Sequence, residues 1–129
     1  MITFQPDDFR VPSRSGDPAN STCVEFACKD REVELRQNRN EWGSPEDHRL
    51  RFPAEDFALW VKGHNAGSTE GLCLSTVQRG DGLWEYRSTL PDADPAAVLV
   101  FDQDEVDAFL ADVKSGKYNA DLGIEPVSV

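Results

Sequence analysis

The fold of this chain is decided by two stretches of sequence, LRFPAEDFALWVKGHNAG at residues 50–67 and LVFDQDEVDAFLADVKSG at residues 99–116. At a constant offset of 49 positions, identical residues meet in three pairs, Leu50 with Leu99, Phe52 with Phe101, and Gly67 with Gly116. Apolar residues recur at i, i+3 and i+4 in both stretches, as Phe57, Trp60 and Val61 and as Val106, Phe109 and Leu110. Because this spacing places them on one face of a helix, each stretch predicts a strand followed by an amphipathic helix.

The repeat extends upstream of both stretches. Cys23-Val-Glu-Phe26 aligns with Cys73-Leu-Ser-Thr76, and Val33-Glu-Leu-Arg36 aligns with Trp84-Glu-Tyr-Arg87. An internal repeat sets the organisation of the whole chain. We therefore expect a first repeat with an N-terminal arm at residues 1–69 and a second repeat with a C-terminal tail at residues 70–129.

Each copy is expected to contain three strands and a helix. In the first copy, the strands are predicted at Cys23–Cys28, Val33–Gln37 and His48–Phe52, with a helix from Pro53 to about Asn65 that stops near Gly67. In the second copy, they are predicted at Gly71–Val77, Leu83–Ser88 and Val98–Phe101, with a helix that Asp102 and Glu105 cap and that stops at Gly116. Phe4 and Phe9 should anchor the arm on the core, and Tyr118–Val129 is expected to be a tail from which Leu122 and Ile124 pack back.

The predicted fold class is α+β, with two repeats that are each a small antiparallel three-stranded sheet plus one helix. A chain of 129 residues with 39% hydrophobic residues is long enough for one ordinary core. A unit of this size cannot bury its apolar face alone, so the two repeats should pack on each other as a pseudo-symmetric unit.

The net charge of −11 is unevenly distributed. Residues 1–69 carry nine Lys/Arg and twelve Asp/Glu (−3), whereas residues 70–129 carry four and twelve (−8). Such a surface repels phosphate, which argues against direct nucleic-acid binding. It favours a basic partner, or else serves only solubility. Without a long apolar run or a basic, apolar leader, the chain is expected to be cytoplasmic and free of membrane contact.

The candidate chemistry is sparse. His48 and His64, with the cysteines, lack the spacing of a zinc site, and the acidic run 102–107 lacks the turn glycine of a calcium loop. No phosphate loop or nucleophile elbow is present in the sequence. We therefore predict no enzyme activity, no catalytic residues, no metal and no cofactor.

The three cysteines are Cys23, Cys28 and Cys73, which are too few for a disulfide scaffold. We expect reduced, packed thiols. A bridge between Cys23 and Cys73 is the alternative, and it requires the two copies to lie strand beside strand.

The candidate partner-binding residues are chosen by residue type and repeat position. Arg36 and Arg87 hold the same place in the two repeats, at a strand end flanked by polar residues. Either each pairs with a carboxylate across its sheet, or together they form related patches for a partner, since Arg is a frequent hot-spot residue. Trp42 and Trp84, in or near loops, are further interface candidates, whereas Trp60 is expected in the core.

The ordered set of motifs resembles the actinobacterial Domain of Unknown Function 397 family. Its pattern is a Trp-x-Lys-Ser-Ser-x-Ser start, an Asn-Cys-Val-Glu-Val-Ala strand, a Val-Arg-Asp-Ser strand and a Leu-x-Phe-(Ser/Thr)-Pro-x-Glu-Trp helix. The corresponding residues here are Phe9, Ser13 and Ser15, then Cys23–Ala27, then Val33–Asn38, then Leu50–Phe57. Asp56-Phe57 replaces Glu-Trp, and the second copy lacks the opening motif. The resemblance covers nearly the whole chain as two tandem copies.

The resemblance implies an accessory role. Family members commonly lie beside genes for helix-turn-helix regulators and resemble small antitoxin-like proteins, some of them dimeric. Two copies in one chain would then be a monomeric fused pseudo-dimer, or else form a homodimer. The expected function is a non-enzymatic protein that binds and modulates a helix-turn-helix transcription regulator. The alternative is an acidic DNA mimic or ligand-sensing module, in which Asp102, Asp104, Asp107 and Asp112 occupy a phosphate-binding groove on the partner.

Overall fold

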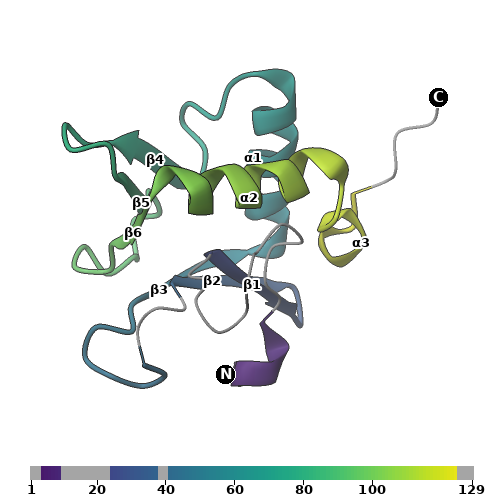
Figure 1. Ribbon diagram of the computed structural model, residues 1–129. Helices are drawn as coiled ribbons and strands as arrows, with labels where there is room; N and C mark the ends of the chain where they lie inside the picture. The colour runs from purple at the N-terminus through teal and green to yellow at the C-terminus, as the bar shows by residue number, and fades with distance from the viewer. Residues whose placement is uncertain (1–3, 10–23, 38–40, 125–129) are drawn as a thin grey trace.

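The computed structural model describes residues 4–9, 24–37 and 41–124 and contains two three-stranded antiparallel sheets, each followed by a helix (Figure 1). The first unit contains β1 (Val24–Lys29), β2 (Glu32–Gln37), β3 (Arg49–Pro53) and α1 (Ala54–Ala66). The second contains β4 (Leu74–Gln78), β5 (Trp84–Ser88), β6 (Leu99–Phe101) and α2 (Gln103–Ser115). A single 3-10 turn, η1 (Pro6–Asp8), precedes them, and the short helix α3 (Asn119–Leu122) follows. The predicted α+β class and the element order are confirmed.

Each sheet is a simple meander with its strands in chain order. A two-residue turn, Asp30-Arg31, joins β1 to β2, and both residues have positive φ (50° and 67°). Two positive φ angles match the right-handed twist of a tight hairpin. Strand β4 begins at Leu74 and not at Gly71 as the sequence predicted, because Gly71 has a φ of 78° within a turn.

The two helices begin differently. Asp102 caps α2: its side chain accepts a hydrogen bond from the Glu105 N–H, and the Glu105 side chain accepts one from the Asp102 N–H. This confirms the predicted capping box. Pro53 is the residue before α1 and the last residue of β3, so its predicted place in the first helical turn is wrong by one position. Both helices end at a glycine with positive φ, Gly67 and Gly116, as predicted.

One hydrophobic core serves both units. The helices lie in the angle between the two sheets, with β1–β3 below them and β4–β6 to one side (Figure 1). The two helices contact each other, and their stripe residues Trp60 and Phe109 stack with ring centroids 6.2 Å apart. Phe109 also meets Tyr86 of β5 at 6.3 Å. Trp60 is 1% exposed, which confirms its predicted core position.

The segment after α2, which the sequence predicted to be a tail, contributes to the hydrophobic core. Tyr118 is fully buried, with its ring 4.2 Å from Phe26 of β1 and 5.9 Å from Phe109. Leu122 and Ile124 pack against the same core, as predicted. The chain therefore fixes its C-terminal side to the first sheet with an aromatic residue that the sequence assigned to the tail. None of the helices in the described ranges is long and apolar enough to cross a bilayer.

A buried polar contact also joins the units. Gln37, the last residue of β2, donates its side-chain amide to Glu105 Oε2 (2.9 Å) and to the Val100 carbonyl (3.1 Å). Glu105 thus caps α2 with one carboxylate oxygen and binds the first sheet with the other. Gln37 and Glu105 are 3% and 4% exposed. The hydrogen bonds fix where α2 and β6 sit on the first sheet.

The cysteines partly match expectation. Cys28 and Cys73 are free thiols, half-buried and buried respectively, and burial raises the pKa of Cys73 to about 12. Cys23 lies outside the described residues, but the alternative bridge to Cys73 is not formed, because Cys73 is a free thiol.

Removing an aromatic ring from the shared core should unfold both units together. We expect Trp60→Ala and Phe109→Ala each to lower the free energy of unfolding by about 3–5 kcal/mol, because each leaves a cavity between the helices. Native-state hydrogen exchange should then show faster exchange in both sheets. Leu59→Ala, at a residue that is 53% exposed on α1, is the control and should change stability little. A sheet that kept full protection in either core variant would contradict a single cooperative core.

Replacing the Gln37 amide with an apolar side chain of similar size should lower the free energy of unfolding. Gln37→Leu removes the donor from a buried carboxylate, and we expect a loss of about 1–3 kcal/mol in urea unfolding. Gln78→Leu is the matched control, since the Gln78 amide makes its hydrogen bond to the Gly82 carbonyl at the exposed surface. Equal losses in the two variants would show that the buried contact adds nothing specific.

Candidate functional site

The outer face of the first sheet carries charged side chains in alternation with core residues. Leu35 of β2 and Leu50 and Phe52 of β3 face the core, so the residues between them face outward. The outward charged residues of β1, β2 and β3 are Glu25, Lys29, Glu32, Glu34, Arg36, Arg49 and Arg51.

Three arginines on this face are held by carboxylates in a continuous network. Arg36 binds Glu25, its cross-strand neighbour, and its Nε lies 3.1 Å from Asp47 Oδ1. Arg49 bridges Asp47 (2.7 Å) and Glu34 (3.1 Å). Arg51 lies 2.8 Å from Glu34 and extends the network to the sheet edge. Arg36 therefore pairs with a carboxylate across its sheet, which is the first of the two alternatives given for it. Its side chain is only 8% exposed.

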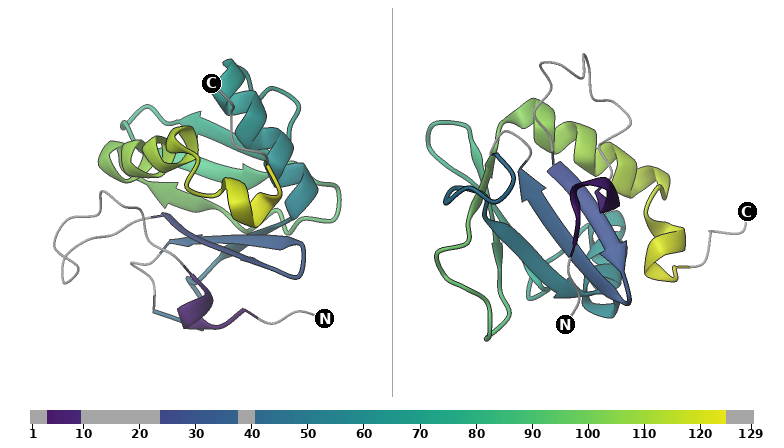
Figure 2. Two further views of the ribbon diagram at one scale, coloured as in Figure 1. Left: turned by 90° about the vertical axis from the view of Figure 1, so that its right-hand side faces the viewer. Right: turned by 90° about the horizontal axis from the view of Figure 1, so that it is seen from below.

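Aromatic rings cover these arginines from outside. The guanidinium carbon of Arg49 lies 3.8 Å from the centre of a Trp42 ring, and that of Arg36 lies 4.9 Å from a Trp42 ring. Phe9 packs edge-on to Trp42 at 5.6 Å, and Phe4 lies against Phe9 at 6.0 Å. We call Phe4, Phe9, Trp42, Arg36, Arg49 and Arg51 the arginine–aromatic cluster. Figure 2 shows η1, between the two phenylalanines, lying over the outer face of this sheet.

The arm is therefore anchored differently from the expectation. Phe4 and Phe9 are buried, but they form a small cluster with Ala27 and Trp42 that is separate from the shared core. Cation–π contacts with desolvated arginines contribute about 0.5–2 kcal/mol each, which favours this closed arrangement.

Asp47 is the electrostatic centre of the cluster. Burial acts to raise its pKa, but hydrogen bonds from Arg49, the Gly43 N–H and Arg36 outweigh it and hold the pKa below the ordinary 3.8. Its side chain is 1% exposed. The charged form of Asp47 is thus part of the folded structure.

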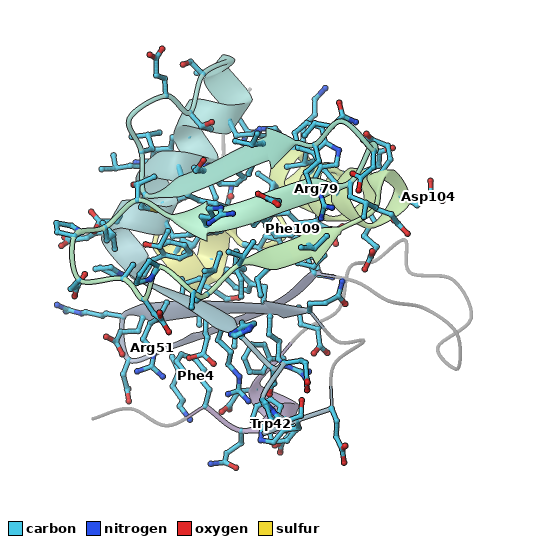
Figure 3. All side chains as sticks on the ribbon, turned by 90° about the vertical axis from the view of Figure 1, so that its left-hand side faces the viewer. Phe4, Trp42, Arg51, Arg79, Asp104 and Phe109 are labelled. Carbon is cyan, nitrogen blue, oxygen red and sulfur yellow. The ribbon has the colours of Figure 1, made fainter. Side chains whose placement is uncertain are left out.

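The outer face of the second sheet is open by comparison. Its outward residues include Ser75, Val77, Glu85, Arg87 and Val100, which we call the second outer face. Val77 is 56% exposed, and Arg87 binds Glu85 (3.0 Å) with half its side chain in solvent. Figure 3 views this face directly, and no segment among the described residues lies across it.

The start of α2 gathers the remaining candidates. Trp84 Nε1 donates to Gln103 (2.9 Å), and the Gln103 amide donates to Asp107 (2.8 Å). Asp104, beside them, is exposed (Figure 3).

The structure thus divides the six predicted partner-binding residues. Arg36 and Trp42 meet in the arginine–aromatic cluster, Trp84, Asp104 and Asp107 share the start of α2, and Arg87 lies on the second outer face. The two arginines do not form one patch. Arg49, Arg51, Glu34 and Asp47 were not predicted as part of a site. The alternation of Arg49 and Arg51 with Leu50 and Phe52 is the sequence signal that both arginines face outward. Nothing in the sequence indicated that Asp47 lies between Arg36 and Arg49.

A cleft of about 490 Å³ opens between β3 and the segment 88–97. Its lining includes Arg51, Asp56, Ser88, Leu90, Pro91 and Asp92. It therefore lies at the junction of the two units. In the described ranges, no three His, Cys, Asp or Glu side chains are placed to hold a metal ion.

Comparisons with known proteins return no relative. No family model matches the chain, and neither a curated protein nor a solved structure is similar to it.

Acid should loosen the arginine–aromatic cluster through Asp47. A carboxyl whose pKa is lowered in the folded state stabilises the fold above its unfolded pKa, and that stability is lost as the pH falls through the folded value. We expect the free energy of unfolding of the wild type to fall as the pH drops below about 3.8. The Asp47→Asn variant should be less stable at pH 7 and show a shallower acid dependence in urea titrations monitored by tryptophan fluorescence. Asp92→Asn controls for the loss of one negative charge, and a slope for Asp47→Asn no shallower than in this control would refute the role of Asp47.

Proposed function

We propose that this chain is a non-enzymatic interaction protein that binds and modulates a helix-turn-helix transcription regulator. The kind of partner follows from the resemblance to the Domain of Unknown Function 397 family. The surface follows from the difference between the two sheets.

The observation that carries the proposal is the unequal cover of the two outer faces. The arginine–aromatic cluster closes the first, where Arg36 and Trp42 are engaged within the chain. The second outer face exposes Val77 and Arg87 with no described segment over them. Arginine is a frequent hot-spot residue, and an exposed apolar side chain near it adds area that a partner can bury. We therefore assign the contact to the second outer face.

We also propose that the two units pack as a pseudo-symmetric pair, as a fused dimer would. Two observations support this. Trp60 and Phe109, which hold the same place in the two helices, stack on each other. Strand β2 contacts β6 and β3 contacts β5, which is the same contact with the units exchanged.

The alternative, an acidic DNA mimic, has fewer exposed aspartates to bind through than the sequence suggested. Asp112 is 5% exposed and lies 3.3 Å from Lys117, and Asp102 caps α2. Of the four aspartates, Asp104 and Asp107 are left exposed at the start of α2. A mimic would bind through these two and would compete with DNA, with a steep loss of affinity in salt.

Capture from native cell extract, followed by titration of the purified partner, tests the proposal. The full chain should retain a helix-turn-helix regulator, and Val77→Glu should weaken the complex at least about tenfold, or 1.4 kcal/mol, by burying a charge at the interface. Leu59→Glu is the matched control, because Leu59 is a similarly exposed apolar residue (53%) on α1. Capture of no regulator, or equal binding by the two variants, would refute the assignment.

The same titration separates the two modes of binding. Docking on the second outer face should change little with salt and tolerate Asp104→Asn with Asp107→Asn. DNA mimicry should fail in that double variant and weaken steeply between about 50 and 200 mM salt.

A further inference from the structure

The two sheets meet at two junctions, β2 with β6 and β3 with β5. The Gln37 side chain fills the first junction, and the cleft opens at the second. At the filled junction, the last residue of the middle strand (Gln37) donates to the third residue of the helix (Glu105) and to the central carbonyl of the edge strand (Val100). At the other junction the same three places belong to Ser88, Asp56 and Arg51. All three of these residues line the cleft.

The open junction lacks the donor that closes the filled one. Ser88 is too short to repeat the reach of Gln37, and its Oγ accepts a hydrogen bond from the Leu90 N–H (3.1 Å). The Asp56 carboxylate has no hydrogen bond or ion pair with any other described residue, although Asp56 is half-buried. A ligand that supplies N–H donors here would replace the missing amide.

The charge around the cleft favours a cation. Four carboxylates line it, those of Glu32, Asp56, Asp92 and Asp94. Of the two lining guanidinium groups, Arg49 binds Asp47 and Glu34, which lie outside the cleft, and Arg51 binds Glu34 and, at 3.7 Å, Glu32 of the lining, which leaves Asp56, Asp92 and Asp94 without an ion pair among the described residues. The excess of negative charge therefore acts on whatever enters the cleft.

The cleft also has an apolar part. Leu90, Pro91, Ala93 and Ala97 line it opposite the edge of β3. Hydrocarbon stems of long cationic side chains pack on such surfaces while their charged heads reach polar groups. The volume of about 490 Å³ lies in the range of small-ligand sites.

We propose that this cleft binds an alkylguanidinium or alkylammonium group, whose head donates to the Asp56 carboxylate and the Arg51 carbonyl while its stem lies on Leu90 and Pro91. The group takes the place that the Gln37 amide occupies at the other junction. Recognition here does not depend on the proposed regulator, because the site is complete within one chain.

The test is an NMR titration of the full chain with acetyl-arginine amide, against the neutral isostere acetyl-citrulline amide. We expect shifts in residues 50–56 and 88–97, with the arginine compound binding at least about tenfold more tightly, because a charge-assisted hydrogen bond is roughly twice as strong as a neutral one. Equal binding of the two compounds, or no shifts at millimolar concentration, would overturn the proposal.

Two variants locate the site. Asp56→Asn should weaken binding at least about tenfold, whereas Asp104→Asn, the same charge change at an exposed position on the other helix, should not. Ser88→Gln restores the amide that the filled junction has and should block the cleft without removing a charge. Unchanged affinity in Asp56→Asn or Ser88→Gln would place the binding elsewhere, and thermal unfolding of each variant confirms that it is folded.

A second arm separates the two sources of such a group. An Ala-Ala-Arg-Ala-Ala peptide that binds more tightly than acetyl-arginine amide assigns the site to a basic segment of a protein, which would extend along the edge of β3. Equal affinity for both assigns it to a free small cation.

Discussion

The structure depends on the packing of Trp60 against Phe109 in the angle between the two sheets. A three-stranded sheet with one helix makes only a small core by itself, and here the two helices pack on each other so that both units share one core. Phe109 contacts Tyr86 of its own unit, and with Tyr118 it reaches Phe26 of the first sheet. The two repeats are therefore separate along the sequence but share one hydrophobic core.

A shared core leaves each copy free to differ at its outer face and at its junction. The first sheet closes its outer face with arginines under aromatic rings, and the second leaves Val77 and Arg87 exposed. Gln37 fills one junction, and Ser88 leaves the other as a cleft. The first difference leaves the second outer face available to a partner, and the second difference opens the cleft beside β3.

Net charge alone is a poor guide to this surface. Part of the negative charge of the second repeat is structural, because Glu105 caps α2 and binds Gln37, and Asp112 pairs with Lys117. Both carboxylates are buried. The acidic surface that a partner meets is thus smaller than the charge of residues 70–129 indicates, which is why the mimicry alternative is left with Asp104 and Asp107.

The sequence by itself determined the local elements, because strand alternation, the helical stripe, the Asp102–Glu105 cap and the terminal glycines act over a few residues. It also determined that two copies must share a core. Only the tertiary structure decided what meets across them: Asp47 between Arg36 and Arg49, Tyr118 between Phe26 and Phe109, and the cleft at Asp56. The physical reason is that these contacts join residues far apart in the chain, and a periodic pattern records which face a side chain occupies but not its neighbour there.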